Sequence, residues 1–590
     1  MKILISPDTK VIAANEISAK KWNVDRIVTR DTIIKANKVI LPFNLENNEV
    51  SFMIPTVLDS VNALSYDGVD LALKILFKTV YERNRGINIV LMGCETVDSF
   101  MRHYSYPNIM KIPGISYSEF NFKTIKNLHL AQCPISNRKD YLKYIENLGI
   151  RIPSSFKSTH SMTNEWCLYK WNSFMEFNEE EIGNINNLYF DYIKTIEKIN
   201  NERYRKISNN EQLQQNLEKL LDTEGKILLI DDKPLWYKFF EKFFAKSNIK
   251  FKAIGSDFTK MTLEEVMKQV KLEVESFCPD IILLDFRLIE DRDAEEKFDN
   301  ISGTLVLQAL KGTFETAGIA YGQQVLIFTA TSRIENILRL KELNADGFIL
   351  KEKPINYNGK EITKNVISKM IATLDAAFQR ADFLIPLNDK LKKLSGIIDT
   401  YFDSEMELSV TVNMASKSVR QLTQNNVLND DILKLVYINI YKVFEEIKRC
   451  PNLVEYPNDF SLIVHANHTL QICSHDGSFI NRKSRDDWNC MNQYNLSSWH
   501  YKYCKDKDLN FAICALILFR LGFSQIDDSD WNDIRIIRNA LVHGANDQLQ
   551  KRHLDLSVQT LKRYSLKMLD LLCAITNPSD IKNVALIKSN

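Results

Sequence analysis

The strongest constraint on the fold is a series of four apolar runs in the middle of the chain, each ending in a polar residue. The runs are KILLI, DIILL, QVLIF and GFIL, and they are followed by Asp231-Asp232, Asp285, Thr329 and Lys351. Short apolar runs that alternate with helical patterns are typical of strands buried on both faces of a parallel sheet. Because parallel strands place their carboxyl ends at one sheet edge, we expect these polar residues to gather there.

Three carboxylates at one sheet edge repel one another unless a cation neutralises them. Mg²⁺ prefers oxygen ligands in octahedral geometry and suits such a cluster. The sequence therefore predicts a Mg²⁺ site at Asp231, Asp232 and Asp285.

The order of acidic pair, aspartate, Ser/Thr and lysine resembles the receiver domain of two-component response regulators. The resemblance implies that residues 225–382 form a flavodoxin-like (βα)5 receiver in the centre of the chain. It implies that Asp285 accepts a phosphoryl group, and that Asp231, Asp232, Asp285 and the backbone carbonyl of Arg287 bind the metal. A histidine kinase or a phosphotransfer protein would then be the partner that supplies the phosphoryl group.

The same resemblance assigns three more positions. Thr329 and Lys351 are expected to contact the phosphoryl oxygens, and Phe348 takes the family's aromatic switch position. A phosphoryl group adds roughly two negative charges. If Thr329 rotates toward it, Phe348 can fill the vacated space, which supplies a two-state element.

Two features depart from the receiver pattern. Asp285 and Thr329 are 44 residues apart (329 − 285 = 44), and the acidic run from Glu290 to Asp299 accounts for this unusual length. Lys351 is followed by Glu352 and then Lys353-Pro354, so Lys353 is an alternative phosphate-contacting lysine. A receiver that serves only for docking is a further alternative.

Residues 383–590 show long helical patterns, notably at 430–449, 510–521 and 531–542, and no βα alternation. Within the last pattern, Arg538-Asn539-Ala540-Leu541-Val542-His543 places arginine and histidine five residues apart. Positions i and i+5 of a helix lie about 140° apart. A helix end near His543, with Gly544 as the terminator, would let the imidazole return toward Arg538.

This R-N-x3-H pattern resembles HEPN domains, which are helical bundles. The resemblance implies a homodimer through this domain and an endoribonuclease that needs no metal or other cofactor. Arg538 would stabilise charge on the RNA phosphate, His543 would move a proton or position the phosphate, and Asn539 would orient one of them. Asp533 is a candidate supporting carboxylate. The charges of residues 551–553 either contact RNA phosphates or form a solvated run.

Residues 1–182 mix short β-rich runs with an amphipathic stretch, which predicts an α/β domain that resembles a degenerate receiver. The strand ends expected there, Ser6-Pro7-Asp8 and Gly93-Cys94-Glu95, offer neither an acidic pair nor a phosphoacceptor. Residues 183–224 are polar with apolar positions at helical spacing, which predicts a helical linker, either solvated or dimerising.

Composition excludes several classes of protein. The 590 residues carry a formal net charge of +1, which argues against a chain-wide electrostatic grip on nucleic acid or membrane. The apolar stretch 511–523 is too short to span a bilayer and is interrupted by Arg520. The ten cysteines form no C-x-x-C pair. We therefore expect a cytoplasmic, multidomain α/β plus all-α protein with no membrane partner.

These features predict a response regulator whose phosphorylation controls a HEPN-type endoribonuclease acting on RNA. The arrangement resembles toxic effectors of phage-defence signalling. The alternative is a non-catalytic switch whose helical domain binds a partner protein. A DNA-binding regulator is a weaker reading, because the chain shows no helix-turn-helix pattern. Activation and repression by phosphorylation are both compatible with the sequence.

Overall fold

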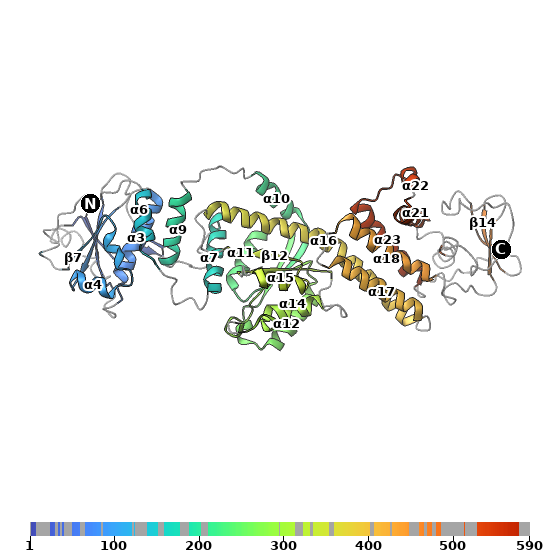
Figure 1. The fold of residues 1–590 in the computed structure, drawn as a ribbon, viewed down its shortest axis with the longest axis horizontal. Helices are drawn as coiled ribbons and strands as arrows, with labels where there is room; N and C mark the ends of the chain where they lie inside the picture. The colour runs from blue at the N-terminus through green and yellow to red at the C-terminus, as the bar shows by residue number, and fades with distance from the viewer. Residues whose placement is uncertain are drawn as a thin grey trace.

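The computed structural model is elongated, with two α/β domains followed by a helical domain (Figure 1). The structure describes residues 2–6, 24–29, 33–35, 38–39, 50–58, 65–83, 87–120, 123, 138–150, 159–177, 188–201, 211–293, 296–312, 322–330, 334–352, 359–401, 406–424, 428–447, 460–464, 469–474, 479–484, 513, 528–544 and 546–576.

The central domain is built on a five-stranded parallel sheet. Its strands are β8 (Gly225–Ile230), β9 (Ile249–Ile254), β10 (Ile281–Asp285), β11 (Gln324–Thr329) and β12 (Gly347–Leu350). They lie in the order β12-β11-β10-β8-β9, and every neighbouring pair is parallel. Numbered along the chain this is 2-1-3-4-5, the doubly wound order of flavodoxin-like folds.

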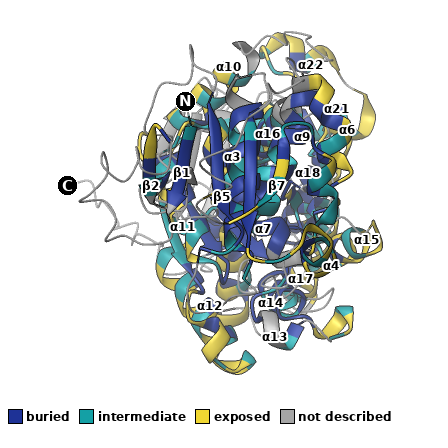
Figure 2. Ribbon diagram, turned by 90° about the vertical axis from the view of Figure 1, so that its left-hand side faces the viewer, coloured by how far each residue is buried: buried dark blue, intermediate teal, exposed yellow. Residues whose placement is uncertain are grey.

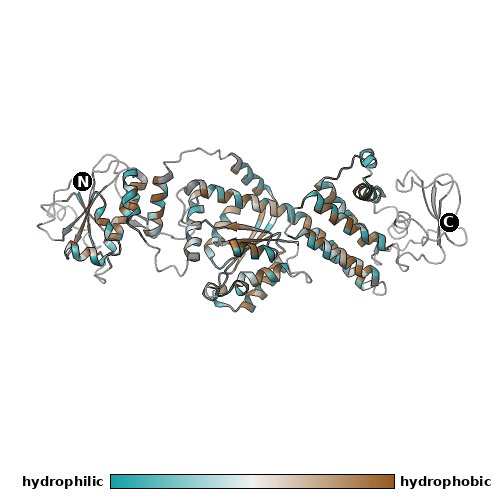
Figure 3. Cartoon of the chain, in the orientation of Figure 1, coloured by the Kyte–Doolittle hydropathy of each residue, from teal (hydrophilic) through white to brown (hydrophobic). Residues whose placement is uncertain are grey.

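Helices cover both faces of this sheet. They are α11 (Pro234–Phe244), α12 (Leu263–Phe277), α14 (Ser302–Lys311), α15 (Ile334–Glu342) and α16 (Gly359–Tyr401). Ile227 and Leu283 pack with α11 and α16, whereas Leu228 and Ile282 pack with α12 and α14. Burial on both faces explains why these strands read as continuous apolar runs, and Figure 3 shows the central strands as hydrophobic.

The edge strand β9 is not among the four predicted strands. Its sequence, IKFKAI, alternates apolar residues with Lys250 and Lys252. Such alternation is the pattern of a strand with one covered face, and it was the signal that could have identified β9.

The N-terminal domain contains a second parallel sheet with the same strand order. Its strands are β1 (Lys2–Ser6), β2 (Arg26–Thr29), β5 (Ser51–Pro55), β6 (Asn88–Gly93) and β7 (Ile115–Glu119), in the order β2-β1-β5-β6-β7. A two-stranded ladder, β3 (Ile34–Lys35) with β4 (Lys38–Val39), lies outside it. Figure 2 shows β1 and β5 in the buried colour. The expected α/β architecture of this segment is thus present.

Helices α3 (Asp67–Arg83), α4 (Val97–His103), α6 (Arg138–Glu146) and α9 (Leu188–Asn201) belong to this N-terminal domain. The segment expected to be a linker is instead packed wherever the structure describes it. On α9, Tyr192, Ile196 and Ile199 are buried in the N-terminal core. Helix α10 (Glu211–Asp222) buries Leu220 in the central core. The apolar residues at helical spacing on α9 and α10 pack against the two domain cores, so a solvated linker is the wrong description of these two helices.

Helix α7 (Thr159–Phe174) comes from the N-terminal segment yet packs on the central domain. Cys167, Leu168 and Trp171 are buried in the same core as Trp236 and Phe328. Helix α9 follows α7 in sequence but packs in the N-terminal core. The chain therefore contributes α7 to the central domain before it returns to the N-terminal domain with α9.

Helix α16 joins the central domain to the helical domain without a break over 43 residues. Its buried residues up to Phe378 belong to the central core, and those from Phe383 onward belong to the helical core. That core also takes α17 (Met406–Thr423), α18 (Asp430–Ile447), α21 (Asp528–His543) and α23 (Val558–Thr576), with α22 (Asn546–Lys551) beside them. Within the described ranges, no helix combines the length and the apolar character that a membrane-spanning segment requires.

The expectation of an all-helical C-terminal segment is wrong at one place. Strands β13 (Phe460–Val464), β14 (Thr469–Ser474) and β15 (Phe479–Ser484) form an antiparallel sheet. The sequence between β14 and β15 contains Asp476-Gly477, a dipeptide favoured in hairpin turns. The predicted helix at 510–521 lies outside the described residues apart from Ile513, which is helical and buried.

Candidate functional site

The carboxyl edge of the central sheet brings three carboxylates together. Asp231 and Asp232 directly follow β8, and Asp285 is the last residue of the neighbouring strand β10. One oxygen of each lies within 4.8 Å of the others, and all three residues are buried. Among the described residues, this is the only cluster of metal-ligating side chains of that kind.

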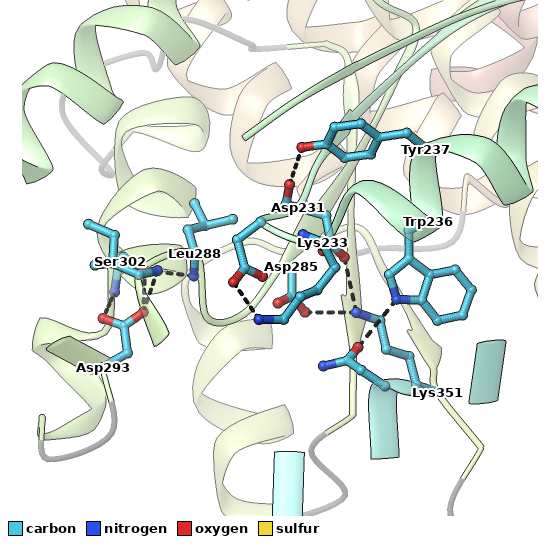
Figure 4. A network of polar contacts seen from close by, with 12 residues as sticks. Asp231, Lys233, Trp236, Tyr237, Asp285, Leu288, Asp293, Ser302 and Lys351 are labelled. Atoms are coloured by element: carbon cyan, nitrogen blue, oxygen red, sulfur yellow. Dashed lines mark hydrogen bonds and ion pairs between the residues drawn. The ribbon is translucent and has the colours of Figure 1, made fainter. Parts of the chain in front are cut away.

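Lys351 lies among these carboxylates as a fully buried cation (Figure 4). Its Nζ is 3.0 Å from Oδ2 of Asp231 and 3.2 Å from Oδ1 of Asp285. The ammonium also lies 4.2 Å from the ring centre of Phe328 and 5.2 Å from that of Trp236. Aromatic faces attract a desolvated cation, so these rings stabilise the lysine inside the fold.

The ammonium groups of Lys351 and of Lys233, the latter 2.9 Å from Oδ2 of Asp232, do not balance three carboxylates. Burial, with repulsion between the carboxylates, raises the pKa of Asp231 to about 6 and of Asp232 to about 7. Burial also raises the pKa of Asp285, against the opposing effect of Lys351. Burial alone would lower the pKa of Lys351, but the two carboxylates outweigh it and the pKa is raised. Excess negative charge in a buried site is the condition that a divalent cation relieves.

The donor set fits Mg²⁺. It consists of carboxylate oxygens alone, which a hard cation prefers. Oδ2 of Asp285 is buried and has no hydrogen-bond donor within the described part of the chain. Arg287 lies two residues after Asp285, so its backbone carbonyl belongs to the turn that directly follows the cluster.

The structure places the two switch residues on neighbouring strands. Thr329 is the last residue of β11 and is fully buried. Its register partner in β12 is Leu350, and its carbonyl accepts a 2.8 Å hydrogen bond from the N–H of Lys351. Phe348 is half-buried and packs against the core on the α12 and α14 side of the sheet. Thr329 and Lys351 thus lie together at the carboxyl edge, whereas Phe348 pairs with Ile327, two residues before Thr329.

In the helical domain, the structure brings Arg538 and His543 into contact. Helix α21 ends at His543, Gly544 follows with φ +68°, and Nη1 of Arg538 is 3.1 Å from Nε2 of His543. Nη1 also donates to Oδ1 of Asn539 at 3.3 Å. Nη2 is anchored by an ion pair with Glu445 of α18, 3.0 Å away, so three polar groups fix the guanidinium.

Asp533 does not join this pair. Its Oδ2 accepts a 2.8 Å hydrogen bond from Tyr564, and its Oδ1 is 3.7 Å from Nε of Arg552. The structure does not support a role for Asp533 at Arg538, because its carboxylate is paired with Tyr564 and Arg552 instead. The pairing also takes Arg552 out of the predicted basic run, leaving Lys551 and His553 exposed.

Within the described residues of the N-terminal domain, no carboxylate cluster of this kind is present. Counted along the chain, the third strand of this five-stranded sheet is β5, and not the NIVLMG run of β6 that the sequence suggested. The position that corresponds to the phosphoacceptor therefore lies at the end of β5. By strand ends and pairing register, Ser6, Pro55, Gly93 and Phe120 correspond to Asp231, Asp285, Thr329 and Lys351. None of them can accept a phosphoryl group as a carboxylate or hold a metal as an acidic pair.

Two groups around the central site were not predicted. Glu352 is buried beside Lys351, with its N–H bonded to Sγ of Cys167 at 3.0 Å and its carboxylate accepting from Thr363. Asp293, inside the acidic run that lengthens the chain between Asp285 and Thr329, is fully buried. The unusual residue after Lys351 was the available signal for Glu352, whereas nothing in the run distinguishes Asp293 from its neighbours.

Comparison with known proteins gives little more. No protein family and no curated protein matches the chain. Among solved structures, it is similar to a signal receiver domain from Vibrio parahaemolyticus assigned to a Luxo repressor protein. The identity is 20%, over 26% of this chain and 96% of that chain, with a TM-score of 0.17.

Proposed function

We propose that the central domain is a receiver that accepts a phosphoryl group on Asp285 and thereby controls the helical domain. The observation that carries this proposal is the buried set of Asp231, Asp232, Asp285 and Lys351 at the carboxyl edge of the sheet. The donor would be a phosphohistidine of a histidine kinase or phosphotransfer protein, or a small acyl phosphate.

In the reaction, an oxygen of Asp285 attacks phosphorus as the bond to the donor's nitrogen or oxygen breaks. A histidine leaving group takes up a proton, whereas an acyl phosphate releases its carboxylate as the anion. Lys351 offsets negative charge on the phosphoryl oxygens, to which Thr329 adds a hydroxyl donor. Asp231, Asp232, Asp285 and the Arg287 carbonyl would hold Mg²⁺. The ion supplies further neutralisation of charge at the transferring group.

We propose further that the helical domain is a metal-independent endoribonuclease. Support comes from the contact between Arg538 and His543 at the exposed end of α21. The 2′-hydroxyl of RNA would attack the adjacent phosphorus and release the 5′-oxygen of the next nucleotide. Arg538 would stabilise the charge on the phosphorane, and His543 would carry the proton or position the phosphate. The protein would act as a homodimer through this domain, and such an effector would suit a phage-defence system.

One observation favours a second candidate, a non-catalytic switch whose helical domain binds a protein. Glu445 already pairs with Arg538 at 3.0 Å, which neutralises the cation that an RNA phosphate would use. Removing both Arg538 and His543 would then leave the function intact.

Incubation of the full chain with total RNA, with and without acetyl phosphate and Mg²⁺, tests the proposal. Cleavage that changes with acetyl phosphate supports a receiver-controlled ribonuclease. Intact RNA in every condition excludes the nuclease and leaves the receiver to be judged by phosphorylation alone.

A further inference from the structure

In the acidic insertion after β10, Asp293 and Ser302 form a buried, hydrogen-bonded pair (Figure 4). Oδ1 of Asp293 accepts from the backbone N–H of Ser302 at 2.9 Å and from Nη1 of Arg292 at 3.2 Å. Its Oδ2 accepts from the Ser302 hydroxyl and from the N–H of Ile289 at 3.3 Å. Asp293 and Ser302 are both fully buried, so these bonds are shielded from water.

The Asp293–Ser302 pair holds the turn that follows the phosphoacceptor, Asp285. The Ser302 hydroxyl accepts a 2.9 Å hydrogen bond from the N–H of Leu288. Leu288 and Ile289 are the two residues after Arg287. Their N–H groups therefore donate to Ser302 and Asp293, respectively. These two bonds hold the turn from the side that follows Arg287 in the chain.

Close packing removes the remaining freedom of this turn. A Cβ on Gly303, the residue after Ser302, would lie 2.4 Å from the carbonyl oxygen of Phe286 and 2.6 Å from that of Asp285. The first turn of α14 thus abuts the backbone between Asp285 and Arg287, and Ser302 begins that helix.

We infer that Asp293 is a positioning residue for the divalent cation, acting through Ser302 and the turn to fix the backbone carbonyl of Arg287. The inference rests on the proposed function, because it takes the carboxylate cluster to bind Mg²⁺. Groups that orient metal ligands from outside the coordination sphere commonly change metal affinity by about 10- to 100-fold when removed. A carboxylate suits the role, since its two oxygens accept from four donors at once.

The test is Mg²⁺ titration of the full chain by isothermal calorimetry, with thermal unfolding measured in EDTA. Asp293→Asn presents an amino group to the donors, and Ser302→Ala removes the bond to Leu288 with little change in volume. Asp299→Asn is the matched control, because Asp299 lies in the same insertion but pairs with Arg339 at 2.6 Å instead of holding the turn. Both test variants should weaken Mg²⁺ binding about tenfold, and the control should not.

If Asp293→Asn fails to fold, Ser302→Ala decides the matter. Mg²⁺ affinity within twofold of the parent in a folded test variant overturns the positioning role, even if the unfolding temperature in EDTA has dropped. Failure of the parent chain itself to bind Mg²⁺ is a different result: it overturns the metal site of the proposed function, and the positioning role with it.

Discussion

The backbone N–H of Glu352 donates a 3.0 Å hydrogen bond to Sγ of Cys167, 185 residues earlier in the chain. This bond fixes helix α7 of the N-terminal segment against the residue that follows Lys351. Burial raises the pKa of the Cys167 thiol, so the sulfur is a neutral acceptor here. On the same helix, Asn164 accepts from the indole of Trp236, whose ring lies beside the Lys351 ammonium. Helix α7 therefore packs directly beside the candidate phosphorylation site and is hydrogen-bonded to two of the residues around Lys351.

Glu352 should make the stability of this contact depend on pH. Burial raises its pKa from 4.5 to about 7, with Thr363 and Lys170 opposing the shift. The unfolded chain keeps the ordinary value, so the folded chain binds the proton more tightly between these two pH values. The stabilisation is present below pH 4.5 and is lost as pH rises through about 7, in total on the order of 3 kcal/mol.

Glu352→Gln should remove this part of the pH dependence. Urea unfolding of the parent and the variant at pH 5 and pH 8 measures it, through the difference in free energy of unfolding between the two proteins. The variant should lose less stability than the parent on going to pH 8. An equal loss in both proteins would show that Glu352 ionises as freely in the folded chain as in water.

Lys351 is expected to be the phosphate-contacting lysine rather than Lys353. Lys351→Gln removes the buried ammonium between Asp231 and Asp285 and should slow phosphorylation by acetyl phosphate about a hundredfold. Lys353→Gln is the matched change two residues later, at a position outside the described part of the chain, and should have little effect. Rates from intact mass against time distinguish the two lysines, and the reverse order would transfer the role to Lys353.

The sequence predicted the central site because its geometry follows from strand order. Apolar runs buried on both faces are distinctive, and polar residues at their carboxyl ends must meet in a parallel sheet. For Asp231, Asp285 and Lys351, position in the chain therefore implied position in space. Helix end signals were similarly local, and Gly544 marked the end of α21 that brings His543 to Arg538.

Contacts between distant segments could not be predicted in the same way. Nothing in the sequence near Cys167 indicates that its helix packs beside Lys351, and Asp293 differs from other acids of its run only by burial. Asp533 shows the same limit, because its partner Tyr564 lies on a helix 31 residues later. Strand β9 was missed for another reason, since its lysines resemble those of an exposed segment.

Arg538 and His543 should be required for RNA cleavage but not for phosphorylation. Arg538→Ala and His543→Ala should each lower cleavage about a hundredfold or more, because charge stabilisation or proton transfer is lost. Arg563→Ala removes an arginine elsewhere in the domain and should retain activity. Cleavage of a labelled RNA, read with intact mass after acetyl phosphate, separates the two functions. Full cleavage in the Arg538→Ala, His543→Ala double variant would favour the protein-binding switch.

Arg380 should couple the central and helical domains. From α16 its Nε donates to Oε1 of Gln324 on β11 at 2.8 Å, and its Nη2 donates to the carbonyl of Thr423 at the end of α17 at 3.1 Å. Arg380→Ala removes both bonds, at a cost of about 1–3 kcal/mol. Amide hydrogen exchange should become faster in the last turn of α17 and stay unchanged in β8 and β10. Gln379→Ala, on the exposed side of the same helix, is the control; equal exchange in both variants would exclude a coupling role.

We expect Asp285 to accept a phosphoryl group, and intact mass spectrometry after treatment with acetyl phosphate and Mg²⁺ measures this transfer. The parent chain and the Asp299→Asn control should each gain the mass of one phosphoryl group, and Asp285→Asn should gain none. No gain in the parent chain, or an equal gain in Asp285→Asn, would contradict the claim.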